Sequence, residues 1–135
     1  MTTTFEYEGK VKSDLDQLKS FLENAVLNLK EYICDEDTMF DLKLILDELM
    51  VNSLFHGNKK DSKKDISLSI RINDESVIID IEDEGNGVDF DFDNYDFTSR
   101  SSSGRGLILV KALTDSLIFD KNRVTAVKKN ISTYW

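Results

Sequence analysis

Proline is absent from this chain of 135 residues, and cysteine and glycine are scarce. The single cysteine, Cys34, has no partner for an internal disulfide, which is compatible with a reducing cytosol. No apolar run approaches the roughly 20 residues that a membrane helix needs. The first residues also lack the basic and apolar regions of a signal peptide. We therefore expect a cytoplasmic protein that does not associate with a membrane.

Positive charge is also in deficit. The chain has 17 Lys and Arg residues against 26 Asp and Glu residues, which gives a net charge of −9. Such a chain repels nucleic-acid phosphates and anionic lipid, so direct binding to DNA, RNA or membrane is not expected. A basic protein partner, or a basic patch on one, fits better.

The hydrophobic fraction of 40% is enough for a core, and the length suits one domain covering residues 1–135. Periodicity predicts helices over 15–29, 36–56 and 104–114, and strands over 4–10, 66–72, 77–81, 116–120 and 123–129. For the second helix, Thr38 and Asp41 resemble a capping pair, and Gly57 suits a left-handed stop. The order predicts an α+β fold, a two-layer sandwich with helices on one face of a mixed or antiparallel sheet.

Two acidic or polar residues share one face of the second predicted helix. Glu48 and Asn52 are four residues apart and therefore one turn apart, and His56 follows after a further turn. Taken alone, such a pair is better explained by a solvated helix face. The pair gains meaning only in combination with other motifs.

Asp83 is the second polar feature. It follows the strand 77–81 with the same parity as the apolar residues Val77, Ile79 and Ile81, so it points inward if they do. A buried carboxylate needs a donor, and the amino group of an adenine ring would serve. The alternative is an ordinary outward Asp in the turn that contains Gly85 and Gly87.

The third feature precedes the last predicted helix, at Gly104-Arg105-Gly106-Leu107. Backbone amides at a helix N-terminus bind anions, glycine lets a phosphate come close, and Arg105 adds a positive charge. A flexible hinge with a surface arginine is the alternative. The spacing matches neither a Walker A loop nor a Rossmann fingerprint.

In chain order the three segments are Glu48-x-x-x-Asn52-x-x-x-His56-Gly57, Asp83-x-Gly85-x-Gly87 and Gly104-x-Gly106-Leu107. This series resembles the N, G1 and G2 boxes of the Bergerat-fold ATPases, which include gyrase, the Hsp90 chaperones and sensor histidine kinases. The chain is most similar to the bacterial anti-sigma-factor serine kinases, from about Phe5 to Lys129.

The resemblance implies a role for each matching position. Glu48 would be the general base, Asn52 would ligate Mg²⁺ and Asp83 would accept from the adenine amino group. Thr125 would help near the adenine. ATP would also be bound by Gly85, Gly87, Gly104, Arg105, Gly106 and Leu107, and residues 88–103 would form the ATP lid. His56 is expected to close the helix rather than to act in catalysis.

The resemblance implies a function as well. The chain would be an ATP-dependent serine-protein kinase that phosphorylates an anti-anti-sigma protein and sequesters a sigma factor. It would also form a homodimer. An alternative is a nucleotide-gated protein-binding module without kinase activity.

Two departures from the family pattern favour that alternative slightly. Acidic and aromatic residues alternate through the expected lid, at Asp89, Phe90, Asp91, Phe92 and Asp93. Lys121-Asn122 stands where the family often has a glycine before the final strand. Both departures concern nucleotide affinity more than the fold.

Overall fold

The computed structural model describes residues 3–86 and 105–134 of the chain. Gly87, Gly104 and the expected lid over residues 88–103 lie outside the described residues. Expectations that concern those positions therefore stay predictions.

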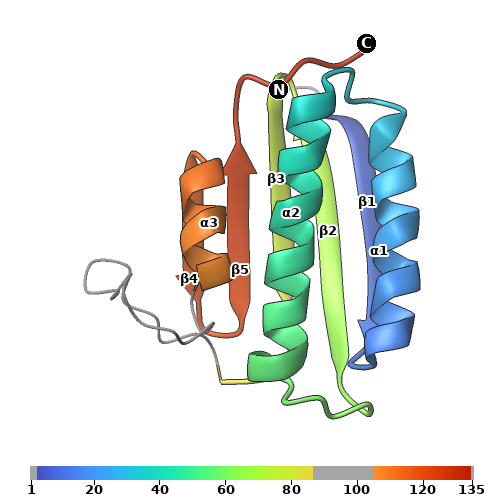
Figure 1. Cartoon of the computed structure of the whole chain (residues 1–135), viewed down its shortest axis with the longest axis vertical. Coiled ribbons are helices and arrows are strands. Elements are labelled where there is room, and N and C mark those ends of the chain that lie inside the picture. Colours follow the sequence, from blue (N-terminus) through green and yellow to red (C-terminus); the bar gives the residue numbers. More distant parts are fainter. Residues whose placement is uncertain (1–2, 87–104, 135) are drawn as a thin grey trace.

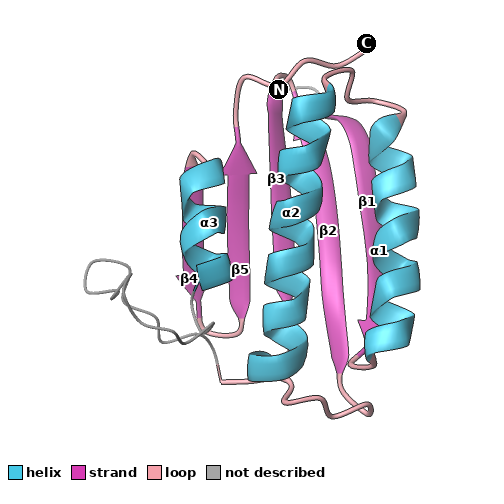
Figure 2. Cartoon of the chain, in the orientation of Figure 1, coloured by secondary structure: helices cyan, strands magenta, loops and turns pink. Residues whose placement is uncertain are grey.

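The described residues form two layers, a five-stranded sheet with helices covering one of its faces (Figure 1). Figure 2 shows the same arrangement coloured by secondary structure. The strands are β1 (Thr3–Lys12), β2 (Asp65–Asn73), β3 (Ser76–Glu82), β4 (Ser116–Asp120) and β5 (Arg123–Lys128). The helices are α1 (Leu15–Lys30), α2 (Glu36–Asn52) and α3 (Arg105–Leu113), and a π-helical turn, η1 (Ser53–Gly57), follows α2. The predicted α+β two-layer fold is confirmed.

The sheet has the strand order β1-β2-β3-β5-β4, and every described neighbouring pair is antiparallel. Two tight turns set the register. Asn73 lies opposite Ser76 in the β2–β3 hairpin, where Asp74 takes a φ of 53°. Asp120 lies opposite Arg123 in the β4–β5 hairpin, where Lys121 takes a φ of 55°.

The core lies between the sheet and the helices. Strands β2 and β3 alternate between buried and partly exposed residues, as a sheet covered on one face requires. The largest side chains that are fully buried come from both layers: Leu18, Leu29, Leu42, Ile45, Leu46, Leu49, Met50, Leu54, Ile66, Ile70, Ile72 and Ile79. Each such side chain contributes about 1.5–3 kcal/mol through burial, which fixes α2 rigidly over the middle of the sheet.

Both long helices begin at an aspartate. Asp14 accepts a hydrogen bond from the backbone N–H of Gln17 at 3.0 Å. Asp35 accepts from the backbone N–H of Thr38 at 3.2 Å and from its hydroxyl at 2.7 Å. The hydroxyl bond holds the pKa of Asp35 below its usual value. The expected pair of Thr38 and Asp41 is therefore corrected, because Asp35 stands one turn earlier and supplies the cap.

Among residues 3–86 and 105–134, no helix is both long enough and apolar enough to cross a membrane.

Candidate nucleotide site

The second helix ends differently from the prediction. The α-helix stops at Asn52, and the chain continues as the π-helical turn η1, in which Asn58 N–H donates to the carbonyl of Ser53 at 2.8 Å. Because the π-helical turn is wider than an α-helical turn, His56 does not continue the α-helical spacing that the sequence predicts after Asn52. The His56 side chain is exposed. Such π-turns occur frequently at functional sites.

Gly57 does not serve as the left-handed stop that the sequence predicts. Its φ lies outside the left-handed region, and a Cβ on Gly57 would overlap the carboxylate of Asp83. A Cβ on Gly85 would likewise overlap the backbone carbonyl of Gly57. The two glycines are therefore required because the end of η1 and the loop after β3 pack directly against each other.

Asp83 points toward the helix layer, as its parity with Val77 and Ile79 predicts, and only 7% of it is exposed. One carboxylate oxygen, Oδ1, accepts from the backbone N–H of Gly85 at 2.8 Å. The other, Oδ2, faces Gly57, and no hydrogen bond from the described residues reaches it. A buried carboxylate with a spare acceptor oxygen suits a ligand that brings an N–H donor.

The β4–β5 turn holds the backbone of Asp83. The N–H of Asp83 donates to the carbonyl of Asn122 at 3.0 Å, and the side-chain amide of Asn122 donates to the carbonyl of Asp83. Asn122 thus fixes the backbone of Asp83, while the Asp83 side chain faces Gly57. In the sequence, Asn122 is noticeable only because Lys121-Asn122 stands where the family often has a glycine.

Asn58 is a second residue that the motif comparison missed. It is 1% exposed, and its side-chain amide donates to Ser13 Oγ at 2.8 Å and to the carbonyl of Asp65 at 3.0 Å. Its Oδ1 accepts from the backbone N–H of Glu84 at 2.7 Å. Asn58 therefore ties the β1–α1 junction, the start of β2 and the loop after Asp83 to the end of η1.

Glu48 lies against the start of α3. A Cβ on Gly106 would overlap Oε2 of the Glu48 carboxylate, so the first turn of α3 passes directly over this side chain. Arg105 opens α3, and Leu107 anchors it in the core with 6% exposure. The arrangement places an acidic side chain beside the positive end of a helix dipole, where phosphates also bind.

Asn52 and Asp83 line one shallow hollow at the end of α2. The other residues around it come from the end of the helix, β4, β5 and the turn between these strands: Ser53, Phe119, Lys121, Asn122, Arg123 and Val124. Phe119 and Val124 are apolar, while Lys121 and Arg123 carry positive charge. The hollow has a volume of only about 10 Å³, room for about one water molecule, so it marks where Asn52 and Asp83 come together and is not itself large enough for a nucleotide base.

Thr125 does not join this group. Val124 and Ala126 are buried beneath the helices, so Thr125 between them lies on the opposite face of the sheet. There its hydroxyl donates to Oδ1 of Asp80 at 2.5 Å. The structure therefore places the Thr125 hydroxyl on the face of the sheet opposite Asp83, which gives no support to the expected contact near the adenine.

Within the described residues, no cluster of three or more His, Cys, Asp or Glu side chains could hold a metal ion. Magnesium beside a nucleotide needs few protein ligands, since phosphates and water supply the rest. The half-buried amide of Asn52, in the hollow with Asp83, fits a single ligand of that kind.

Comparison with known proteins agrees with this geometry. Residues 11–129 match the family model described as histidine kinase-like ATPase domain. No curated protein shows a significant similarity to the chain. The match spans the helix of Glu48 and Asn52, the loop of Asp83 and the start of α3, and it supports ATP binding. The chain belongs to the family of histidine kinase-like ATPase domains.

Proposed function

We propose that this chain is an ATP-dependent protein-serine kinase that also acts as an anti-sigma factor. The observation that carries the proposal is the packing of Glu48 against the first turn of α3, at Gly106. A carboxylate at this point lies one helical turn from Asn52, the proposed Mg²⁺ ligand. It is thus beside the positions where both the metal and the phosphates are expected.

The remaining site residues hold the nucleotide in this proposal. Asp83 accepts from the adenine amino group through the oxygen that faces Gly57. The backbone amides that open α3 contact the phosphates, and the absence of a side chain on Gly106 leaves room for the Glu48 carboxylate beside them. Asn52 would hold Mg²⁺, which would supply charge neutralisation at the phosphates.

Glu48 acts on the second substrate, a protein serine. It takes the proton from the serine Oγ as that oxygen attacks the γ-phosphorus of ATP. The new Oγ–P bond forms while the bond from the γ-phosphorus to the bridging oxygen breaks, and ADP leaves with that oxygen. Position and charge neutralisation supply most of the rate in such transfers.

The proposed protein partners are an anti-anti-sigma protein that carries the serine and a sigma factor. The net charge of −9 supports a partner with a basic surface and disfavours direct contact with DNA. The family resemblance in the sequence supports this particular pair of partners.

The test is a pull-down from native cell extract with and without ATP, followed by phosphosite mapping of the bound proteins. We expect a sigma factor and a phosphoserine protein, and we expect neither phosphoserine nor ADP formation with Glu48→Gln. The matched control is Asp47→Asn, the same change of charge one residue away on α2, which should transfer phosphate at the parental rate. Recovery of neither partner contradicts the proposal.

The second candidate is the nucleotide-gated binding module. The expected lid is rich in aspartate, and Lys121-Asn122 replaces a glycine, which favours altered nucleotide handling. This candidate predicts partner binding that differs between ADP and ATP while no phosphoprotein forms. Glu48→Gln would then leave partner binding unchanged.

A further inference from the structure

Four lysines stand close together in the loop that joins η1 to β2. They are Lys59, Lys60, Lys63 and Lys64, and the only acidic residue among them is Asp61. Without this lysine loop, residues 58–64, the 17 basic and 26 acidic residues of the chain fall to 13 and 25, a net charge of −12. The lysine loop is therefore a basic segment on an otherwise acidic protein.

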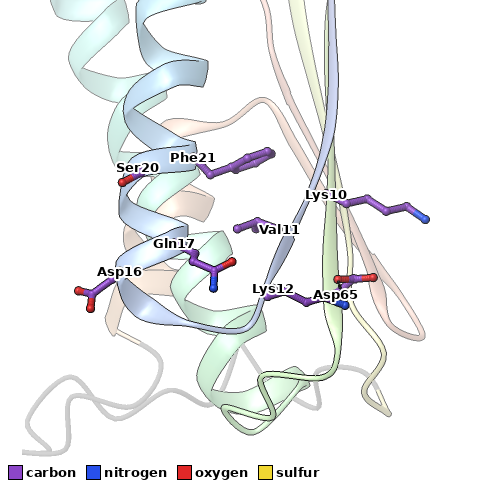
Figure 3. A pocket seen from close by; sticks show the side chains of 8 residues that line it. All are labelled: Lys10, Val11, Lys12, Asp16, Gln17, Ser20, Phe21 and Asp65. Carbon is purple, nitrogen blue, oxygen red and sulfur yellow. Dashed lines mark ion pairs between the residues drawn. The ribbon is translucent and has the colours of Figure 1, made fainter.

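The charge of the lysine loop is exposed and not neutralised by the residues around it. The side chains of Lys59, Lys60 and Lys63 are exposed. Within residues 3–86 and 105–134, none of the ion pairs involves an ammonium group of this loop. Asp65, the acid that follows the loop, pairs with Lys12 at 2.9 Å instead (Figure 3). The positive charge is thus available to a partner.

Backbone hydrogen bonds hold the lysine loop in place. The N–H of Lys60 donates to the carbonyl of Leu54 at 2.8 Å, and the N–H of Lys64 donates to the carbonyl of Asp61 at 2.9 Å. The carbonyl of Lys64 accepts from both the backbone N–H and the hydroxyl of Ser13, each at 3.0 Å. A loop fixed in this way loses little conformational freedom when a partner binds.

Two of the lysines occupy backbone positions that favour glycine. Lys59 has a φ of 51° and Lys60 a φ of 61°. The left-handed region is unfavourable for a residue with a Cβ, and glycine or asparagine adopts it more readily. Both side chains are exposed, so burial does not offset this cost. Lysine at strained positions indicates a role for the ammonium groups other than stability.

An exposed aromatic ring lies beside the lysine loop. Phe55 of η1 is 38% exposed, and Nζ of Lys60 lies 5.4 Å from the centre of its ring. Figure 1 shows the lysine loop at the same end of the molecule as the loop after β3. Asn58 joins the two loops by accepting from the N–H of Glu84 at 2.7 Å. A partner bound here would therefore lie next to the candidate nucleotide site.

We propose that Phe55 and the four lysines form a surface that binds an acidic segment of a partner protein, with an apolar side chain of that segment against Phe55. Charge complementarity selects this partner. A nucleic-acid duplex or a membrane is anionic over a wide area and would also meet the charge of −12 on the rest of the chain, which repels it. A short acidic segment contacts the basic surface alone. The proposal does not depend on kinase activity.

The probe for this surface is a fluorescein-labelled peptide in which glutamates surround one phenylalanine. Fluorescence anisotropy with the full chain should show saturable binding that weakens as salt is added. A peptide with glutamine in place of each glutamate should bind at least about tenfold more weakly. Equal binding of the two peptides overturns the proposal. Tighter binding of a DNA duplex or of phosphatidylserine vesicles overturns the choice of a protein partner.

A glycine variant separates binding from folding. In Lys59→Gly/Lys60→Gly the left-handed backbone is relieved, so the variant should melt no lower than the parent. It should bind the glutamate peptide about tenfold more weakly, because two of the four charges are gone. Lys59→Gln/Lys60→Gln keeps both Cβ atoms and should lose binding to the same extent.

The matched control is Lys19→Gln/Lys30→Gln, which removes the same charge at exposed positions of α1 and should bind the peptide with near-parental affinity. Peptide binding that survives both changes at Lys59 and Lys60 overturns the proposal. An equal loss of binding in the control overturns it too, since net charge alone would then explain the effect.

Discussion

The carboxylate of Asp83 occupies the space that a side chain at Gly57 would need. The two residues are 26 positions apart in the chain, and the π-turn η1 brings them into contact. The residue proposed to recognise adenine is thus placed by a glycine on another element. The backbone of Asp83 is held from the β4–β5 turn by Asn122.

Gly57→Ala should therefore damage nucleotide binding. The added methyl group has to displace the Asp83 carboxylate or the η1 backbone, which we expect to cost about 1–3 kcal/mol of stability. Calorimetric titration with ATP should show at least about a tenfold loss of affinity, since Asp83 moves away from the adenine. Gly9→Ala is the matched control. Its methyl group meets the movable ring of Phe21, so ATP affinity should stay unchanged. Equal ATP affinity in the two variants would contradict this account.

Asn58→Ala should lower both stability and ATP affinity. The substitution removes the hydrogen bonds to Ser13 Oγ, the Asp65 carbonyl and the Glu84 N–H at a site with 1% exposure. We expect a loss of about 2–4 kcal/mol, because buried groups remain without partners. Urea unfolding measures the loss. Gln17→Ala, which removes an exposed side-chain amide from the first turn of α1, should change stability by less than about 0.5 kcal/mol. Similar midpoints for the two variants would show that the Asn58 network contributes little.

Local sequence pattern predicts most of the fold and part of the site. Alternation predicts the β2–β3 hairpin and the inward direction of Asp83, since both depend on parity within one strand. The role of Gly57 depends on contact with a loop 26 residues away, which no local pattern contains. Asn58 and Asn122 act through tertiary hydrogen bonds, and an asparagine in a loop gives no signal of its partners. Thr125 is different, because Val124 and Ala126 on either side already indicate that it faces the other way.

Thr125→Val should leave ATP affinity unchanged. The Thr125 hydroxyl donates to Asp80 on the uncovered face of the sheet, away from the hollow that contains Asp83. The free energy of unfolding should fall by about 1 kcal/mol, because Asp80 loses this hydrogen bond but keeps Arg123 at 3.5 Å and Arg71 at 3.8 Å. Val124→Thr is the matched change on the helix-side face, within the hollow, and should alter ATP affinity. A large loss of ATP affinity in Thr125→Val would show that Thr125 contributes to nucleotide binding.

Asp47→Asn should make the protein more stable at neutral pH. Asp47 borders the groove between α1 and α2, where burial raises its pKa and Lys43 partly opposes that rise. The folded state then holds the Asp47 proton more tightly than the unfolded state. The stabilisation that this bound proton gives the folded state is complete below the unfolded pKa of about 3.9. It is lost as pH rises through the folded pKa. The partly exposed position limits the gain from Asp47→Asn at pH 7 to about 0.5 kcal/mol.

The measurement for Asp47 is urea unfolding at several pH values between about 4 and 7, bracketing the ordinary pKa of a carboxyl group. The advantage of Asp47→Asn over the parent should shrink as pH falls, since protonation removes the charge from the parent side chain as well. Glu23→Gln, the same change at an exposed carboxyl on the α1 side of this groove, is the matched control measured alongside. If Asp47→Asn is less stable than the parent at pH 7, attraction to Lys43 outweighs burial at this position.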